Sequence, residues 1–214
     1  MSYDHAYLKK TDHYRPSNSL LHFFQNEISH RLSNRPEILE TGCGDGSLFY
    51  GLEKFSVMAV DISREALRRV HPSSHIQFVE GDILTIALDK KFDLVFDAHL
   101  FHCLAGEGDL EKYLLRVKEL LKRDGIFSFE TMVQSKGMSF EFDQYFDYQT
   151  GLLYQGEHPV RKILSTFTIE KMLLDIGFKI NFFKVMSEMK VVASPHRREV
   201  ANGDPDLLRV IVGF

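Results

Sequence analysis

Three glycines spaced one residue apart follow a short apolar run and a carboxylate near position 40. Gly42, Gly44 and Gly46 come just after Glu40, which itself follows Ile38 and Leu39. Glycine lets the chain turn tightly and lets a ligand lie against bare peptide, because no Cβ fills the space. The stretch therefore predicts a strand that runs into a nucleotide-type binding turn.

The spacing of these glycines selects among possible ligands. A dinucleotide-binding turn has the pattern G-x-G-x-x-G, and here Ser47 stands where its third glycine is expected. A phosphate-binding loop needs Gly-Lys-Ser or Gly-Lys-Thr, and the turn contains no lysine. Neither phosphate-binding pattern fits the turn well.

Three further apolar runs end in carboxylates at suitable distances. The run from Val57 ends at Asp61, which is 19 residues after Gly42 and so close to the roughly 20 at which a Rossmann-like unit places its ribose acceptor. A third run ends at Asp82, and a fourth, beginning at Phe92, ends at Asp97. Each aspartate alone also fits a helix cap or a turn. Their conjunction favours a ligand site.

The four motifs together resemble the class I S-adenosylmethionine-dependent methyltransferases, in which an acidic residue precedes a G-x-G-x-G turn. The resemblance is strong over residues 36–131 and rests on strand order elsewhere. It implies S-adenosylmethionine as cofactor and S-adenosylhomocysteine as product. The cofactor-binding residues that it implies are Glu40, Gly42, Cys43, Gly44, Asp61, Ile62, Asp82, Ile83 and Asp97.

The resemblance also implies a role for several of these side chains. Glu40 would position the glycine turn or reach the methionine ammonium group. Asp61 would accept hydrogen bonds from the ribose hydroxyls. Asp82 would meet the adenine amino group, and Ile83 would flank the adenine ring.

The chain alternates strand and helix patterns, which predicts an α/β fold with a mainly parallel sheet covered on both faces. The resemblance implies a Rossmann-like, doubly wound sheet of seven strands in the order 3-2-1-4-5-7-6, with the seventh strand antiparallel. Beyond the four motifs, the pattern predicts helices after Ser17, from Asp109 to Gly125 and from Thr168 to Gly177, and strands over 126–130, 178–185 and 207–214.

We expect a single methyltransferase domain over residues 1–214, with two additions to the minimal fold. Residues 1–35 form an N-terminal helical arm, in which Tyr7 and Tyr14 are candidate substrate contacts. Residues 132–165 form an aromatic-rich insertion after the fifth strand. Ligands of open α/β folds bind at the carboxyl edge of the sheet, so the insertion is a candidate substrate lid; a dimer contact is the alternative.

Methyl transfer from a sulfonium is an in-line displacement whose leaving group is already activated. The protein mainly aligns the reactants and excludes water. A hydroxyl or thiol nucleophile also needs a proton acceptor, and histidine titrates in the right range. His102 is the first candidate and His99 the second, both just past the fourth strand; His102 is also a candidate substrate contact. The alternative is that these rings only shape the pocket.

Composition limits the partners. The formal net charge of -4 gives no general attraction for a phosphate backbone, so nucleic acid is a disfavoured partner. No apolar run approaches the length of a membrane span, and the first residues lack a signal segment, so we expect no membrane association and a cytoplasmic location. The two cysteines make neither a disulfide framework nor a zinc motif, and we expect no bound metal.

The leading hypothesis is a methyltransferase that acts on an oxygen, nitrogen or sulfur atom of a small molecule. Two alternatives stay open. The chain could methylate proteins, with the insertion gripping a peptide, or it could be a catalytically inactive cofactor-binding partner of another subunit. A homodimer is also possible, since an exposed aromatic cluster usually marks some interface.

Overall fold

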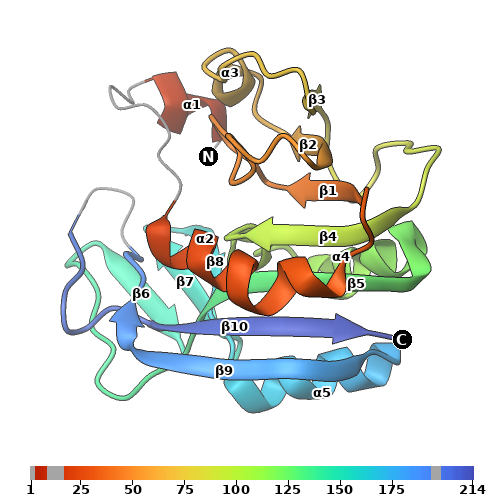
Figure 1. Cartoon of the computed structure of the whole chain (residues 1–214). Helices are drawn as coiled ribbons and strands as arrows, with labels where there is room; N and C mark the ends of the chain where they lie inside the picture. Colours follow the sequence, from red (N-terminus) through yellow and green to blue (C-terminus); the bar gives the residue numbers. More distant parts are fainter. Residues whose placement is uncertain (1–2, 9–16, 194–198) are drawn as a thin grey trace. The chain divides into compact units, whose positions relative to one another are not determined.

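The computed structural model describes residues 3–8, 17–193 and 199–214, apart from the side chains of residues 3, 5 and 6. Its main sheet has seven strands in the hydrogen-bonded order β3-β2-β1-β4-β5-β10-β9 (Figure 1). The strands are β1 Glu37–Thr41, β2 Ser56–Asp61, β3 Ile76–Glu80, β4 Phe92–Ala98, β5 Leu121–Val133, β9 Lys179–Lys190 and β10 Asp206–Gly213.

The strand order confirms the order implied by the resemblance, because β9 and β10 are the sixth and seventh strands of this sheet along the chain. β1 pairs in parallel with both β2 and β4, and β2 pairs in parallel with β3. β10 runs antiparallel to β9, and Figure 1 shows their arrows pointing in opposite directions. The carboxyl ends of β1, β2, β3 and β4 therefore lie at one edge of the sheet.

The helices differ from the predicted ranges at two boundaries. The helix predicted to reach Gly125 ends at Leu120, and Gly125 lies inside β5 instead. A Cβ at Gly125 would lie 2.9 Å from the carbonyl oxygen of Phe92, so this glycine allows a close backbone approach rather than ending a helix. The helices are α1 Tyr3–Leu8, α2 Asn18–Phe23, η1 Phe24–Ile28, η2 Ser29–Arg31, α3 Arg64–Leu67, η3 Phe101–Cys103, α4 Asp109–Leu120 and α5 Thr166–Ile176.

The second correction concerns α5, which begins two residues before Thr168. Ser165 is its N-cap, because the Ser165 hydroxyl oxygen accepts a hydrogen bond from the Thr168 backbone N–H at 3.1 Å. Thr168 therefore lies within the first turn. The predicted C-terminus is confirmed, since Gly177 closes the helix in the left-handed conformation with φ 92°.

The described chain divides into two compact units. The first holds residues up to Ala98 together with Leu115–Ser128 and Phe214. Its core contains a cluster of edge-to-face aromatic rings; Phe24 lies 5.1 Å from Phe49 and 6.2 Å from Phe96, measured between ring centroids. The cluster joins the N-terminal helical segment to β4 and the glycine turn. The single-domain organisation stays a prediction.

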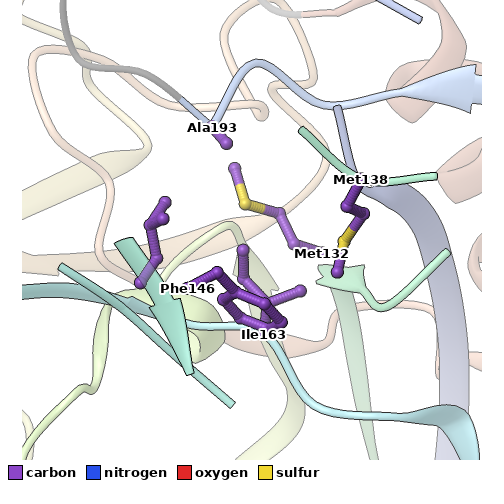
Figure 2. Close-up of a cluster of buried hydrophobic side chains, with 6 residues drawn as sticks. Met132, Met138, Phe146, Ile163 and Ala193 are labelled. Carbon is purple, nitrogen blue, oxygen red and sulfur yellow. The ribbon is translucent and has the colours of Figure 1, made fainter. Parts of the chain in front are cut away.

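The second unit holds His99–Leu114 and Phe129–Gly213. It contains a separate antiparallel sheet of three strands: β6 Gln144–Asp147, β7 Leu152–Gln155 and β8 His158–Lys162. This small sheet lies within the predicted insertion. Its apolar face contributes to a buried cluster that Figure 2 shows, made of Met132, Met138, Phe146, Leu153, Ile163 and Ala193.

Candidate functional site

The glycine turn after β1 has the conformation that its sequence predicts. Gly42 and Gly44 both have positive φ angles, 68° and 60°, a region that side chains disfavour. The Gly42 N–H donates a hydrogen bond to the Val60 carbonyl oxygen at 2.8 Å, which ties the turn to the end of β2. The turn therefore presents bare backbone at the carboxyl edge of the sheet.

Asp61 at the end of β2 holds the same turn through its side chain. One carboxylate oxygen accepts the Gly44 N–H at 2.7 Å, and the other accepts the Ser63 N–H at 2.8 Å. Burial raises the pKa of Asp61, and the two backbone N–H donors partly oppose that rise. Asp61 therefore fixes the glycine turn, and its carboxylate oxygens retain lone pairs that a further donor can use.

Glu40 is buried behind the turn. One of its carboxylate oxygens accepts a hydrogen bond from the Ser47 hydroxyl, and the other accepts the Leu48 N–H at 2.9 Å. Burial raises the pKa of Glu40 to about 7 despite these donors. Of the two predicted roles, this geometry matches the positioning of the glycine turn, and Ser47 is the partner that sequence reasoning did not assign.

Tyr7 covers the open side of the turn. A Cβ placed on Gly44 would lie 2.5 Å from the Tyr7 hydroxyl oxygen. The helix that carries Tyr7 is anchored by Asp4, whose carboxylate accepts a hydrogen bond from the Ser63 hydroxyl at 2.6 Å. The structure thus brings Tyr7 to the predicted cofactor turn. Tyr14 lies outside the described residues.

Three more of the predicted cofactor-binding residues follow β2 and β3. Asp82 accepts the Leu84 N–H at 2.9 Å, and Ile83 is buried. Ile62, next to Asp61, is instead 55% exposed.

Two other predicted cofactor residues are buried in the same unit. Asp97 lies opposite Thr41 in the β1–β4 pairing and is fully buried. The Cys43 thiol is also buried, and burial, with the charges of Glu40 and Asp61 nearby, raises its pKa. An inert thiol in the turn agrees with a packing role for Cys43.

The first candidate proton acceptor, His102, lies in the second unit on η3 and is 2% exposed. Its Nδ1 accepts the backbone N–H of Met132 at 3.3 Å and lies 3.2 Å from the Thr131 hydroxyl oxygen. Burial, with the charges of His99 and Arg161 nearby, lowers the pKa of His102 well below its ordinary value. His102 is therefore neutral, with its ring proton assigned to Nε2 because Nδ1 accepts the amide.

His99 has a different environment in the same unit. Its backbone φ is 104°, which makes it the one described non-glycine residue with positive φ. The ring Nε2 lies 3.2 Å from a carboxylate oxygen of Glu130, while the side chain is 41% exposed. The other oxygen of Glu130 accepts the Arg209 Nε–H at 2.7 Å, and both of these side chains are buried. The arrangement orients an accessible imidazole against a fixed carboxylate.

The contacts of Glu130 with His99 and Arg209 favour the negatively charged form of its side chain. Burial alone would raise the pKa of Glu130, but its hydrogen bond and ionic contacts with His99 and Arg209 outweigh that effect and hold the pKa below its ordinary value. Glu130 is therefore a carboxylate at neutral pH. Sequence reasoning did not predict this network, because its three members are far apart in the chain.

Residues 39–129 match the family model described as "Methyltransferase domain". The match begins in β1 and ends in β5, so it contains the glycine turn and all of the strand ends described above. Over these residues the chain is a methyltransferase domain, which confirms the resemblance to the class I S-adenosylmethionine-dependent methyltransferases. Its cofactor is S-adenosylmethionine, and it is an enzyme of the methyltransferase class.

Solved structures share this methyltransferase fold at low sequence identity. The CcbJ methyltransferase from Streptomyces caelestis has a TM-score of 0.69 and 16% identity, over 98% of this chain and 95% of that one. An S-adenosylmethionine-dependent methyltransferase from Clostridium acetobutylicum has a TM-score of 0.64 and 20% identity, covering 90% and 89%. The glycopeptide N-methyltransferase MtfA with S-adenosylmethionine has a TM-score of 0.64 and 20% identity, covering 94% and 96%. No curated protein sequence matches the chain.

Within residues 3–8, 17–193 and 199–214, no group of three or more histidine, cysteine, aspartate or glutamate side chains is placed to hold a metal ion. Within the same part of this methyltransferase, no helix is both long and apolar enough to cross a membrane.

Proposed function

We propose that the protein transfers the methyl group of S-adenosylmethionine to a small-molecule acceptor. The observation that carries the proposal is the hydrogen bond from the Gly44 N–H to Asp61, which holds a bare backbone turn beside a carboxylate. A ligand with ribose hydroxyls and a polar tail fits such a turn, and a Cβ at Gly44 would collide with the Tyr7 side chain that covers it.

The cofactor roles follow from the positions of the side chains. Asp61 takes the ribose hydroxyls, and Glu40 holds the turn from behind. Asp82 is the acceptor for the adenine amino group, since only one of its carboxylate oxygens caps Leu84 among the described residues. Ile62 and Ile83 supply the apolar contacts of the ring. We propose Tyr7 as a cover of the cofactor turn as well as a substrate contact.

We also propose that His99, rather than His102, takes the proton of the acceptor. If the His99 Nε2–H donates to Glu130, then Nδ1 is the ring atom with an open lone pair, and the exposed ring can reach a solute. In His102, Nδ1 is committed to the Met132 amide and the ring is buried. In this proposal His102 is an uncharged side chain that lines the acceptor site, and its Nε2–H can donate a hydrogen bond.

The names of two solved neighbours agree with a small acceptor. One neighbour is a glycopeptide N-methyltransferase, and another, DhpI, was solved with S-adenosylmethionine and HEP. Both similarities are below 25% identity, so they show the fold alone and support the acceptor class only as a proposal. The protein-methyltransferase and inactive-partner alternatives are tested in the same experiment.

The test is a transfer assay that measures S-adenosylhomocysteine formation. The purified chain is incubated with S-adenosylmethionine and separate pools of small alcohols, amines, thiols and carboxylic acids, and in parallel with peptides. Turnover on a small-molecule pool supports the proposal. Turnover on peptides alone would establish the protein-methyltransferase alternative, and cofactor binding without turnover on any pool would favour the inactive partner.

Histidine variants test the proton acceptor once an acceptor is found. His99→Gln should lower kcat and remove the rise of activity with pH that deprotonation of a base produces, while the affinity for S-adenosylmethionine stays unchanged. His30→Gln is the matched control, because His30 is exposed in the other unit. A His99→Gln enzyme with the wild-type pH profile would contradict the assignment.

A further inference from the structure

An arginine lies on the buried face of the small sheet. In the pairing of β6, β7 and β8, Phe146 lies opposite Leu153, and Leu153 lies opposite Arg161. Residues paired across antiparallel strands share one face, so the three form a row. Phe146 and Leu153 belong to the buried apolar cluster of Figure 2. Arg161 therefore lies on the same face of the small sheet as the buried Phe146 and Leu153.

The guanidinium of Arg161 has unusually few partners. Among the described residues, its buried Nε has no hydrogen-bond partner, and its one hydrogen bond runs from Nη1 to the carbonyl oxygen of the preceding residue, Val160, at 2.7 Å. No carboxylate of the described residues forms an ion pair with it. By contrast, Arg209 pairs with Glu130 at 2.7 Å, and Arg116 pairs with Glu119 at 3.0 Å.

The helix that packs against β8 brings a neutral histidine, not a counter-charge, to Arg161. β8 packs against η3, which carries His102, and the charge of Arg161 contributes to the low pKa of that histidine. Glu130, a buried carboxylate of the same unit, is already bound to His99 and Arg209. Arg161 is half-buried, and burying its Nε without a hydrogen-bond partner or a counter-charge is costly, because the lost hydration of that atom is not replaced.

From this placement we propose that Arg161 is an anion receptor, which binds a carboxylate or phosphate group of the methyl acceptor. A guanidinium presents donors in a planar fork that matches two oxygens of either group, so one substrate anion would supply the missing counter-charge and the missing partner of Nε. The inference rests on the proposed function and narrows its acceptor to an anionic small molecule. It makes Arg161 a specificity residue of the second unit.

Simple snorkelling of the side chain does not explain the arrangement as well. An arginine that only covers apolar surface keeps its guanidinium in water, whereas the Nε of Arg161 is buried. Arg116 supplies the comparison, since its Nε is also buried without a partner but its Nη1 and Nη2 bind Glu119 and the Ile86 carbonyl oxygen. Arg116 is thus a structural arginine with its charge satisfied, and it serves as the internal control.

The first experiment observes the two arginines directly by NMR. The Nε–H signal of Arg161, identified by its loss in Arg161→Lys, is followed while sodium phosphate or sodium acetate is added at constant ionic strength. We expect a saturable shift with phosphate, acetate or both, no saturable shift with chloride, and no response of Arg116. A response equal to that of Arg116, or an equal response to chloride, would overturn the proposal.

The second experiment measures acceptor preference in the intact enzyme. Acceptors are offered in matched pairs. One member of each pair is an acid, and the other is its uncharged amide or ester. The wild type should prefer the anion in kcat/KM by about 10-fold to 100-fold, the range of a charge-assisted hydrogen-bond pair. Arg161→Gln should lose the preference mainly through KM, whereas Arg161→Lys keeps part of it and Arg116→Gln keeps all of it.

The outcomes separate this inference from the proposed function. If S-adenosylmethionine does not bind the wild type, the proposed function itself fails. If the cofactor binds and methyl transfer proceeds equally on charged and uncharged acceptors, only the anion receptor is overturned. Cofactor affinity is measured in each Arg161 variant, so a misfolded variant is recognised by its loss of S-adenosylmethionine binding. If Arg161→Gln is misfolded, the acceptor preference of Arg161→Lys tests the anion receptor.

Discussion

The Nδ1 atom of His102 accepts a hydrogen bond from the backbone N–H of Met132, with 3.3 Å between the nitrogen atoms. The contact uses the lone pair that a general base would need, and it joins η3 to β5. A ring that is buried, neutral and committed to a backbone amide is suited to support the structure around it.

Replacing His102 should therefore reduce stability. His102→Gln would leave the buried Met132 N–H without a well-placed acceptor, and we expect the free energy of unfolding to fall by about 1–3 kcal/mol. Urea unfolding followed by circular dichroism measures the change. His30→Gln, at an exposed position, should shift the unfolding free energy by less than about 0.5 kcal/mol. Equal stability of the two variants would show that the amide contact contributes nothing.

Gly44 and Gly137 form a matched pair for the glycine turn. Both have positive φ, 60° and 71°, but a Cβ at Gly44 would lie 2.5 Å from the Tyr7 hydroxyl oxygen, whereas one at Gly137 meets nothing within 4 Å. Alanine at either position should cost about 1 kcal/mol of stability through backbone strain. Only Gly44→Ala should also weaken S-adenosylmethionine binding in calorimetry. Indistinguishable cofactor affinities in the two variants would argue against the turn as the binding site.

Glu40 should make stability depend on pH in the direction opposite to an ordinary ion-paired carboxylate. Its pKa is raised from 4.5 to about 7, so the folded state holds the proton more tightly than the unfolded state. The stabilisation is complete below pH 4.5 and is lost as the pH rises through 7.

Glu40→Gln removes this titration and provides the test. Relative to the wild type, the variant should gain about 2–3 kcal/mol of unfolding free energy between pH 5 and pH 8, the amount that linkage gives for this shift. Denaturant unfolding at a series of pH values, with Glu53→Gln as an exposed control, measures the difference. A constant difference across the series would contradict the raised pKa.

The Glu130–Arg209 pair predicts a large effect of a single charge removal. Arg209→Met leaves a buried carboxylate with one partner fewer, and we expect a loss of about 3–5 kcal/mol of stability. The double variant with Glu130→Gln should recover part of that loss, because no uncompensated charge then remains. Thermal and urea unfolding of the single and double variants test this, and additive losses would contradict the coupling.

The same pair has a pH signature. The pKa of Glu130 lies below its ordinary value in the folded state, so its contribution to stability is present above the unfolded pKa and is lost as the pH falls through the folded pKa. In Glu130→Gln, the unfolding free energy should therefore fall less steeply as the pH is lowered into the acid range. An unchanged acid limb would show that the carboxylate is not ionised in the folded protein.

The cofactor half of the site could be predicted from the sequence because its signals are local. Glu40 and Asp61 each stand near the end of an apolar strand and Gly44 follows in the turn after β1, and parallel strands bring such ends to one edge. Tyr7 was predicted as a substrate contact, and only the structure places its hydroxyl over Gly44.

The histidine site depends on contacts that no local pattern encodes. Whether His99 or His102 has an open ring nitrogen is decided by Glu130 on one side and the Met132 amide on the other, both from β5. The same holds for Arg161, since its inward face follows from strand pairing across a short hairpin with an irregular register. The misplaced helix end at Gly125 has a similar cause, because the glycine serves a close approach to β4 rather than a cap.

The most direct test of the account is calorimetric titration of the wild type and Asp61→Ala with S-adenosylmethionine, S-adenosylhomocysteine and NAD. We predict selective binding of the two sulfur nucleosides by the wild type, with dissociation constants of about micromolar order, and a loss of about 10-fold to 100-fold in Asp61→Ala. Asp175→Ala, an exposed carboxylate on α5, should bind as the wild type does. Preference for NAD, or unchanged affinity in Asp61→Ala, would contradict the account.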